Sequence, residues 1–416
     1  MRFEKGCRLD GVHSGRNLRL LFAYWFLRDF QLWIPVWVVY LTINRGFSLT
    51  EVTTAESAFL LGVLLLEVPT GAVADRYGRS RSMALGALVL GVAILTFALT
   101  SSFAILLVSF LVWAVGHTLM SGADMALLYD TLKAAGREAS YERLAGRGIA
   151  ASWSGAALAT LFGGPFAAVL DPRATMFFGA ATCVATAAIA LTIWEPPHLA
   201  AEAKQPYLRS IRAAFAEVWH NTDVRIVVLL ASTAFAALES VHYLMQPYLV
   251  DRGIDVGTLF SLLQVPVLLA GLAGALLADR FSGRAGAKAL LFGPIAGAAG
   301  YALLAGAPGL WAYLALPLVI GVGSCLEPIV TGFINRRIGS ERRATVLSIA
   351  SMSRSVVLAG LAPGVGYTTD RWGLSEAFAL GGVCTLVAGL AFGLPLVWRS
   401  ARDHEVVALA EEEPAA

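Results

Sequence analysis

The fold of this chain is decided by the stretch Gly71-Ala-Val-Ala-Asp75-Arg76-Tyr-Gly78-Arg79-Ser-Arg81. It lies between two long apolar runs and carries one aspartate and three arginines. Because glycine adopts backbone conformations that other residues avoid, Gly78 allows the chain to reverse tightly. The arginines favour a water-facing position. From the residues alone we expect a basic turn between two hydrophobic helices.

The composition is that of a protein that crosses a membrane several times. Of its 416 residues 57% are hydrophobic and 14% are charged, and the mean hydropathy is +0.69. A soluble domain would carry about a quarter charged residues. The net charge of +2 gives no indication of nucleic-acid binding. The first apolar run follows a polar, basic segment and is too long for a signal peptide, so we expect no cleavable signal.

A membrane helix needs about 20 apolar residues. Twelve runs meet this length, at about 18–42, 52–74, 83–101, 104–129, 147–170, 174–194, 224–249, 256–278, 287–306, 310–333, 345–368 and 375–397. We therefore expect an all-α membrane protein with twelve transmembrane helices.

The basic residues predict the orientation. If the N-terminus is cytoplasmic, most of the 31 Lys and Arg lie in cytoplasmic segments, as the positive-inside rule requires. The external loops then hold Arg45, Arg173, Arg252 and Arg371. We expect a multi-pass protein of the plasma (inner) membrane with both termini in the cytoplasm.

The longest polar interval, 195–223, divides the runs six and six. Pro196 and Pro197 end the sixth helix. Within the interval, residues 207–219 alternate apolar and basic positions at helical spacing, which predicts an interfacial amphipathic helix. We expect four segments: an N-terminal six-helix bundle at 1–194, a cytoplasmic linker at 195–223, a C-terminal bundle at 224–397 and a cytoplasmic tail at 398–416.

The two halves repeat one another. The stretch 275–284, Ala-Leu-Leu-Ala-Asp-Arg-Phe-Ser-Gly-Arg, echoes the stretch at 71–81, and Ser-Gly-Ala-Asp at 121–124 is echoed by Gly-Ser-Cys-Leu-Glu at 323–327. Because such pairs recur in the same order, we expect two parallel six-helix halves with a substrate site near mid-membrane.

The opening stretch resembles the signature loop of the major facilitator superfamily of secondary transporters, Gly-x-x-x-Asp-(Arg/Lys)-x-Gly-(Arg/Lys)-(Arg/Lys). The matching positions are Gly71, Asp75, Arg76, Gly78 and Arg79, whereas Ser80 departs and Arg81 supplies the charge one step later. The drug/proton antiporter branch is the most similar in character. The resemblance implies two pseudo-symmetric six-helix bundles, alternating access and a monomer without cofactor or metal.

Ionisable residues fall on only some of the apolar runs. A charge at mid-bilayer costs about 2.5 kcal/mol or more, so such residues usually have a use. Apart from Lys288 and Glu376 at the second positions of the ninth and twelfth runs, the third, sixth, ninth and twelfth runs carry none; in the family that the chain resembles, these helices form the outer support. The candidates for proton or substrate binding are Arg28, Asp29, Glu67, His117, Asp124, Glu239, His242, Glu327 and Arg354.

Among these we favour Asp29, followed by Glu239 and Glu327, as sites for a proton or a cationic substrate. A carboxyl group in an apolar cavity can take up and release a proton at working pH. The alternative is a structural ion pair in which Arg28 or Arg354 neutralises a neighbouring acid. Adjacent helical residues lie about 100° apart, so we expect Arg28 and Asp29 not to point into the cavity together. The two histidines either titrate or bond to backbone carbonyls.

Aromatic residues on the first and seventh runs provide either a cavity wall for a bulky solute or an interfacial belt. They are Tyr24, Trp25, Trp33, Trp37, Tyr40, Tyr243 and Tyr248. We expect Tyr40 and Tyr248 in particular to belong to the belt.

The resemblance also implies a gate on the cytoplasmic side. Asp75 would cap the start of the helix at 345–368, and Asp130 would pair with Arg76 or Arg79. A mirror clasp would use Asp279 and Arg280 near the start of the fifth helix. Gly71 and Gly78 complete the candidate gate.

Our first functional hypothesis is proton-coupled efflux of small hydrophobic or cationic compounds, with protons and the lipid bilayer as the other partners. One alternative is a symporter or facilitator for a metabolite or organic anion that uses Arg28 or Arg354. A non-transporting membrane sensor is the alternative outside transport. In antiporters of the family that the chain resembles, helix 5 carries a Gly-Pro pair followed shortly by a Gly-Gly pair. Here Gly164 and Pro165 keep the first pair, but no glycine pair follows. No nucleophile or metal-ligand motif indicates an enzyme.

Overall fold

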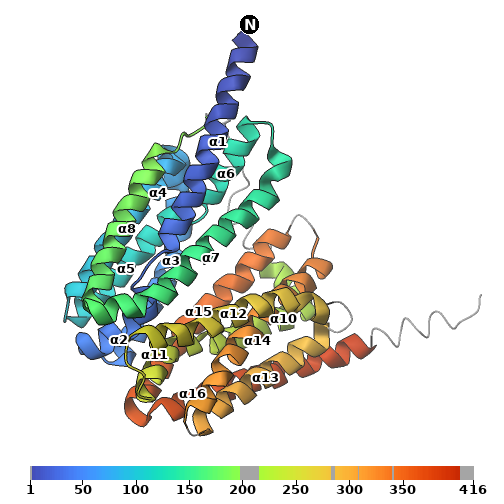
Figure 1. Ribbon diagram of the computed structural model, residues 1–416. Coiled ribbons are helices and arrows are strands. Elements are labelled where there is room, and N and C mark those ends of the chain that lie inside the picture. Colours follow the sequence, from blue (N-terminus) through green and yellow to red (C-terminus); the bar gives the residue numbers. More distant parts are fainter. Residues whose placement is uncertain (1, 197–214, 283–285, 308, 340–341, 403–416) are drawn as a thin grey trace, which may run out of the picture. The chain divides into compact units, whose positions relative to one another are not determined.

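The computed structural model describes residues 2–196, 215–282, 286–307, 309–339 and 342–402, and nearly all of them are helical (Figure 1). Most of the predicted amphipathic helix at 207–219 lies outside the described residues; residues 215–220 are helical. The tail beyond residue 402 also lies outside them.

Within each half of the chain the helices follow one another with short connections (Figure 1). The first half of the chain contains α1 (Arg2–Asp29), η1 (Ile34–Val36), α2 (Trp37–Val39), η2 (Tyr40–Asn44), α3 (Leu49–Tyr77), α4 (Arg79–Leu99), α5 (Phe103–Met120), α6 (Ala123–Ala134), η3 (Glu138–Ser140), α7 (Tyr141–Val169) and α8 (Pro172–Thr192). The second half contains α10 (Thr222–Glu239), α11 (Val241–Asp251), α12 (Thr258–Phe281), α13 (Gly286–Gly306), η5 (Leu310–Leu314), α14 (Ala315–Arg337), α15 (Arg343–Trp372), α16 (Leu374–Ala388) and η6 (Gly389–Gly393).

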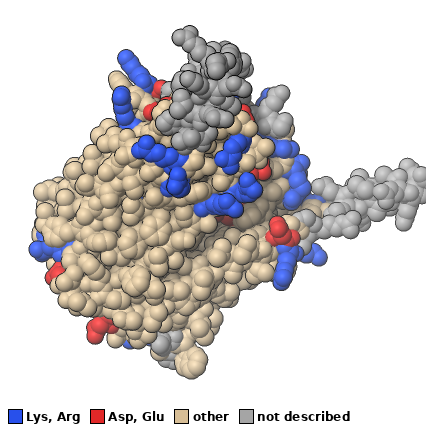
Figure 2. All heavy atoms as spheres, turned by 45° about the horizontal axis from the view of Figure 1, so that its top comes forward, with Lys and Arg blue, Asp and Glu red and all other residues tan. Residues whose placement is uncertain are grey.

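Eleven stretches of the described chain are long and apolar enough to cross a membrane. The run predicted at 147–170 is not among them and forms the C-terminal part of α7. Small and weakly polar residues such as Ser152 and Gly155 lower its hydropathy without interrupting the helix. Wide parts of the surface in Figure 2 carry no charged side chain, as lipid-facing helices require. The all-α membrane fold that the sequence predicts is therefore confirmed.

Three of the predicted continuous helices are interrupted. The first helix begins earlier than the run predicted at 18–42, because α1 starts at Arg2, and it breaks inside that run, because α1 ends at Asp29. The run at 104–129 divides into α5 and α6 at Gly122, whose φ of 75° is incompatible with a right-handed helix. The run at 224–249 divides at Ser240, where the hydroxyls of Ser240 and Tyr301 donate to the carbonyl oxygen of Ala237.

The chain forms two compact units. The first consists of Met1–Glu202 with Leu249–Val265, and the second of Ala203–Tyr248 with Pro266–Ala416. Residues 249–265, predicted within the C-terminal bundle, thus belong to the first unit. There Gln264 Nε2 donates to the carbonyl oxygen of Pro35 at 3.1 Å.

Glycines permit close packing of helices inside each unit. In the first unit α4 packs against α5 and α8, and a Cβ at Gly86 would lie 2.7 Å from the carbonyl oxygen of Gly116. In the second unit α13 packs against α14 and α16, and a Cβ at Gly381 would lie 2.9 Å from the ring of Tyr301. Such close approach is typical of helices that associate in lipid.

Candidate functional site

An ionic cluster in the first unit joins Arg28, Asp29 and Asp124; we call it the Arg28 cluster. Arg28 Nη1 lies 2.7 Å from Asp124 Oδ2, and Arg28 Nη2 lies 3.0 Å from Asp29 Oδ2. Arg28 Nη2 also donates to Ser152 Oγ at 3.2 Å. One guanidinium therefore faces two carboxylates, and the cluster carries one more negative than positive charge when both acids are ionised.

Asp124 is held more firmly than Asp29. Trp25 Nε1 donates to Asp124 Oδ2 at 2.8 Å, and the backbone N–H of Met125 donates to Asp124 Oδ1 at 2.7 Å. Asp124 lies in the first turn of α6, where the helix dipole favours a negative charge. Its side chain is only 5% exposed. Asp124 is thus a fixed counter-ion of Arg28.

Asp29 is the last residue of α1, and its side chain is 33% exposed. The expectation that Arg28 and Asp29 would not face the same cavity is wrong, because both line one cavity and bond to each other. The reason is local. Both residues lie in the last turn of α1, and the long Arg28 side chain reaches Asp29 Oδ2 from its own position on the helix.

Gln31 stabilises this helix end. Its Nε2 donates to the carbonyl oxygen of Arg28 at 3.2 Å and to Thr182 Oγ1 at 3.0 Å, while its Oε1 accepts from Trp33 Nε1 at 2.9 Å. Since an unpaired carbonyl is costly away from water, the buried amide compensates for the backbone N–H that the interrupted helix lacks.

A cavity of about 470 Å³ lies beside the Arg28 cluster, entirely among residues of the first unit. Its lining includes Arg28, Asp29, Asp124, Trp33, Trp113 and His117. The ring centroid of Trp113 lies 5.3 Å from that of Trp33 and 4.6 Å from that of Phe59. The predicted aromatic wall is present in part. By contrast, Tyr40 and Tyr248 were expected at the interface, but both are buried.

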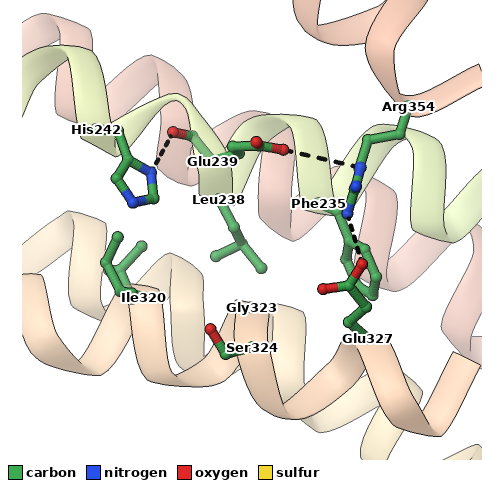
Figure 3. Close-up of a pocket in the computed structure, with 10 residues that line it drawn as sticks. Phe235, Leu238, Glu239, His242, Ile320, Gly323, Ser324, Glu327 and Arg354 are labelled. Carbon is green, nitrogen blue, oxygen red and sulfur yellow. Dashed lines mark hydrogen bonds and ion pairs between the residues drawn. The ribbon is translucent and has the colours of Figure 1, made fainter. Parts of the chain in front are cut away.

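The second unit holds a corresponding group, the Arg354 cluster of Arg354, Glu239 and Glu327 (Figure 3). Arg354 Nη1 lies 3.2 Å from Glu327 Oε1, and Arg354 Nε lies 3.9 Å from Glu239 Oε2. The residues come from α15, α14 and the last position of α10. Again one arginine faces two carboxylates.

Two small cavities adjoin the Arg354 cluster. One, of about 200 Å³, is also lined by His242 and Ser324 (Figure 3), and the other, of about 220 Å³, by Thr331 and Ser351. The Glu327 and Arg354 side chains line both. His242 Nδ1 donates to the carbonyl oxygen of Glu239 at 3.0 Å, which is the backbone bond that the sequence allowed for.

The signature loop is built around Gly78. This residue separates α3 from α4 with a φ of 102°, and Glu195 Oε1 accepts from the backbone N–H of Arg79 at 2.6 Å. The Arg79 guanidinium forms an ion pair with Asp130 and lies 3.9 Å from Asp75 Oδ1. The structure thus brings together three of the candidate gate residues within the first unit.

Other candidates lie apart from these groups. Glu67 is exposed on α3 and belongs to neither ionic cluster. Arg76 lies over the ring of Tyr77, 5.5 Å from its centroid. Asp279 and Arg280 are exposed near the end of α12, and the clasps between the halves remain predictions. Among the described residues no group of three or more His, Cys, Asp or Glu could hold a metal ion.

Three contributing residues were missed by sequence reasoning: Gln31, Ser152 and Glu195. Trp25 was predicted as part of an aromatic wall or belt, but its bond to Asp124 was not. Nothing in the sequence marks Ser152, which lies 124 positions from Arg28. Glu195 carried a signal, because an acid directly after a membrane run lies at the same face as the basic loop. Gln31 also carried a signal, because an amide within an apolar run needs hydrogen-bond partners, and an open backbone carbonyl at a helix end can supply one.

Long apolar helices in two units, with ionic clusters and cavities inside them, define a polytopic membrane transport protein. The chain belongs to the Major Facilitator Superfamily, which residues 20–363 match. The family and the similar structures are those of transporters, not enzymes.

Similar proteins support the fold. A crystal structure of the nucleoside transporter NupG has a TM-score of 0.80 at 15% identity, covering 92% of this chain and 99% of that one. A bacterial homologue of the human lysosomal transporter Spinster, inward-facing and unoccupied, has a TM-score of 0.70 at 17% identity, covering 97% of this chain and 99% of that one. An uncharacterised transporter of this type, YxaM of Bacillus subtilis (strain 168), is 27% identical over 108 residues; the match spans 26% of this chain and 27% of that protein.

Proposed function

We propose that this protein is a proton-coupled efflux transporter of small hydrophobic or cationic compounds that works by alternating access. The observation that carries the proposal is the pair of ionic clusters. Each cluster sets one arginine against two carboxylates within apolar helices. Because an excess negative charge is unfavourable there, each cluster favours a bound proton or cation.

The same geometry argues against the organic-anion alternative. That alternative needs Arg28 or Arg354 as a counter-ion for substrate, but both guanidinium groups already bond to carboxylates. An anion would have to displace Asp124, which Trp25 and the backbone of Met125 also hold. The nucleoside transporter with the similar fold is 15% identical, which does not carry its substrate to this chain.

Flux in proteoliposomes tests the proposal. The full-length protein is reconstituted, a pH gradient is imposed, and ethidium transport is followed by fluorescence. We expect transport that depends on the gradient and is lost with Asp29→Asn. Glu376→Gln, which changes an exposed acid outside both clusters, is the matched control. Flux that ignores the gradient and survives Asp29→Asn would reject proton-coupled antiport.

A further inference from the structure

We infer that the cavity of the first unit is the substrate seat, and that it binds a singly charged cation with an aromatic body, with Asp29 as its counter-ion. This inference rests on the proposed function and names the substrate class. The Arg354 cluster of the second unit is assigned the proton instead.

The charges of the cavity select one positive charge. Asp124 and Arg28 neutralise each other through a bond of 2.7 Å, and Trp25 with the backbone N–H of Met125 keeps the Asp124 carboxylate in place. Asp29 is therefore the carboxylate of this cluster that remains available. Within the described chain, Arg28 is the one residue whose side chain bonds to it.

The end of α1 points in the same direction. Asp29 occupies the last position of that helix, and the C-terminal end of a helix carries partial negative charge, which favours a cation. Asp124 occupies the opposite kind of position, in the first turn of α6. The backbone thus stabilises the negative charge of Asp124 itself, whereas at Asp29 it stabilises a cation bound beside the carboxylate.

The walls select an aromatic body. Trp113 is half-buried at the cavity and stands at the centre of a ring cluster with Trp33, Phe59 and Phe110. Trp33 is itself buried, with its indole N–H bonded to Gln31, so it packs behind Trp113, whose ring is the partly exposed one at the cavity. A cation over such rings gains from their negative faces.

Size separates the two units. The cavity of about 470 Å³ falls within the range of about 300–1,000 Å³ that small-molecule sites occupy. The cavities beside the Arg354 cluster, at about 200 and 220 Å³, are smaller. Phe235 is the aromatic residue that lines them. Neither of the two alone reaches that range, and we assign the proton rather than an aromatic ion to the cluster that they share.

Binding to the purified full-length protein in detergent tests this assignment without a gradient. Tetraphenylphosphonium and tetraphenylborate have the same shape and opposite charge, and their binding is measured by calorimetry and by quenching of tryptophan fluorescence. We expect the cation to bind and the anion not to bind. Asp29→Asn should weaken cation binding by tenfold or more, as expected for a lost charge partner, and Asp29→Glu should restore much of it. Trp113→Leu should weaken binding roughly threefold to tenfold through the lost ring.

The outcomes are separable. Equal binding of both ions, or cation binding unchanged by Asp29→Asn in folded protein, would overturn the substrate seat even if flux proves proton-coupled. Conversely, Asp29-dependent binding together with flux that ignores the pH gradient would retain the seat and reject the proposed coupling. Size-exclusion elution and the Asp29→Glu variant show whether a loss of binding reflects misfolding, and Glu376→Gln should bind as the unaltered protein does.

Discussion

Arg28 Nη1 lies 2.7 Å from Asp124 Oδ2, although the two residues are 96 positions apart in the chain and belong to different helices. The bond joins the end of α1 to the first turn of α6, so it ties together the two interrupted helices that border the cavity of the first unit. It also leaves Asp29 as the acid that can exchange its partner.

Asp124→Asn should destabilise the protein more than Asp29→Asn does. Removing the Asp124 charge leaves Arg28 inside apolar helices with a weaker partner, and breaking a buried pair costs about 3 kcal/mol or more. Thermal unfolding of the purified variants in detergent measures the difference. The double change Arg28→Gln with Asp124→Asn should recover part of the loss, because it removes the unpaired cation and leaves only the partly exposed Asp29 carboxylate without its partner. Equal unfolding temperatures for Asp124→Asn and Asp29→Asn would contradict the fixed role of Asp124.

Glu327→Gln should uncouple transport from protons while substrate still binds. Glu327 is the closer partner of Arg354, at 3.2 Å, and its side chain lines both small cavities of the second unit. Ethidium flux with and without a pH gradient, compared with tetraphenylphosphonium binding, separates the two effects. A variant that loses binding and keeps its response to the gradient would reverse the assignment of the two units.

Gly78→Ala should lower stability by about 1–3 kcal/mol, because its φ of 102° strains any side chain. An added Cβ would also lie 2.6 Å from Glu195 Oε2. Gly71→Ala is the matched control, since a Cβ there meets nothing within 4 Å and alanine favours a helix. Unfolding temperatures that fall equally for both variants would show that the turn at Gly78 is not special.

Asp75→Asn should slow turnover while substrate binding persists. Asp75 is 70% exposed and lies 3.9 Å from Arg79, which itself pairs with Asp130, so the change leaves the inner pair of the loop in place. The predicted clasp with the start of α15 would lose its charge. Initial rates of ethidium flux at saturating substrate measure this, and a turnover number equal to that of the unaltered protein would reject the clasp.

Much of the fold could be predicted from the sequence because long apolar runs and basic loops are local signals. The all-α membrane architecture and the basic turn at Gly78 followed from them. The breaks at Asp29 and Ser240 could not be predicted, since they depend on tertiary hydrogen bonds: Gln31, which bonds to the Arg28 carbonyl, is held by the distant Thr182, and Tyr301 bonds to the Ala237 carbonyl from 64 positions away. A hydropathy pattern contains no trace of such bonds.

The residues of the candidate site could be predicted from the sequence, but the pairing of its arginines with particular acids could not. Charges within apolar runs identified the members of both clusters. Which acid bonds to Arg28 most firmly depends on Trp25 and on the helix turn that contains Asp124. Neither can be read from the spacing of the chain, because the helix predicted at 104–129 was expected to be continuous there.

Proton movement that accompanies ethidium flux tests the central claim most directly. The protein is reconstituted in vesicles that contain pyranine, ethidium is added outside, and the internal pH is followed, with protein-free vesicles as the background. Antiport predicts that the internal pH rises in proportion to ethidium entry, and that the rise is lost with Asp29→Asn and with Glu327→Gln. Ethidium entry through the protein without a change of internal pH would contradict the account.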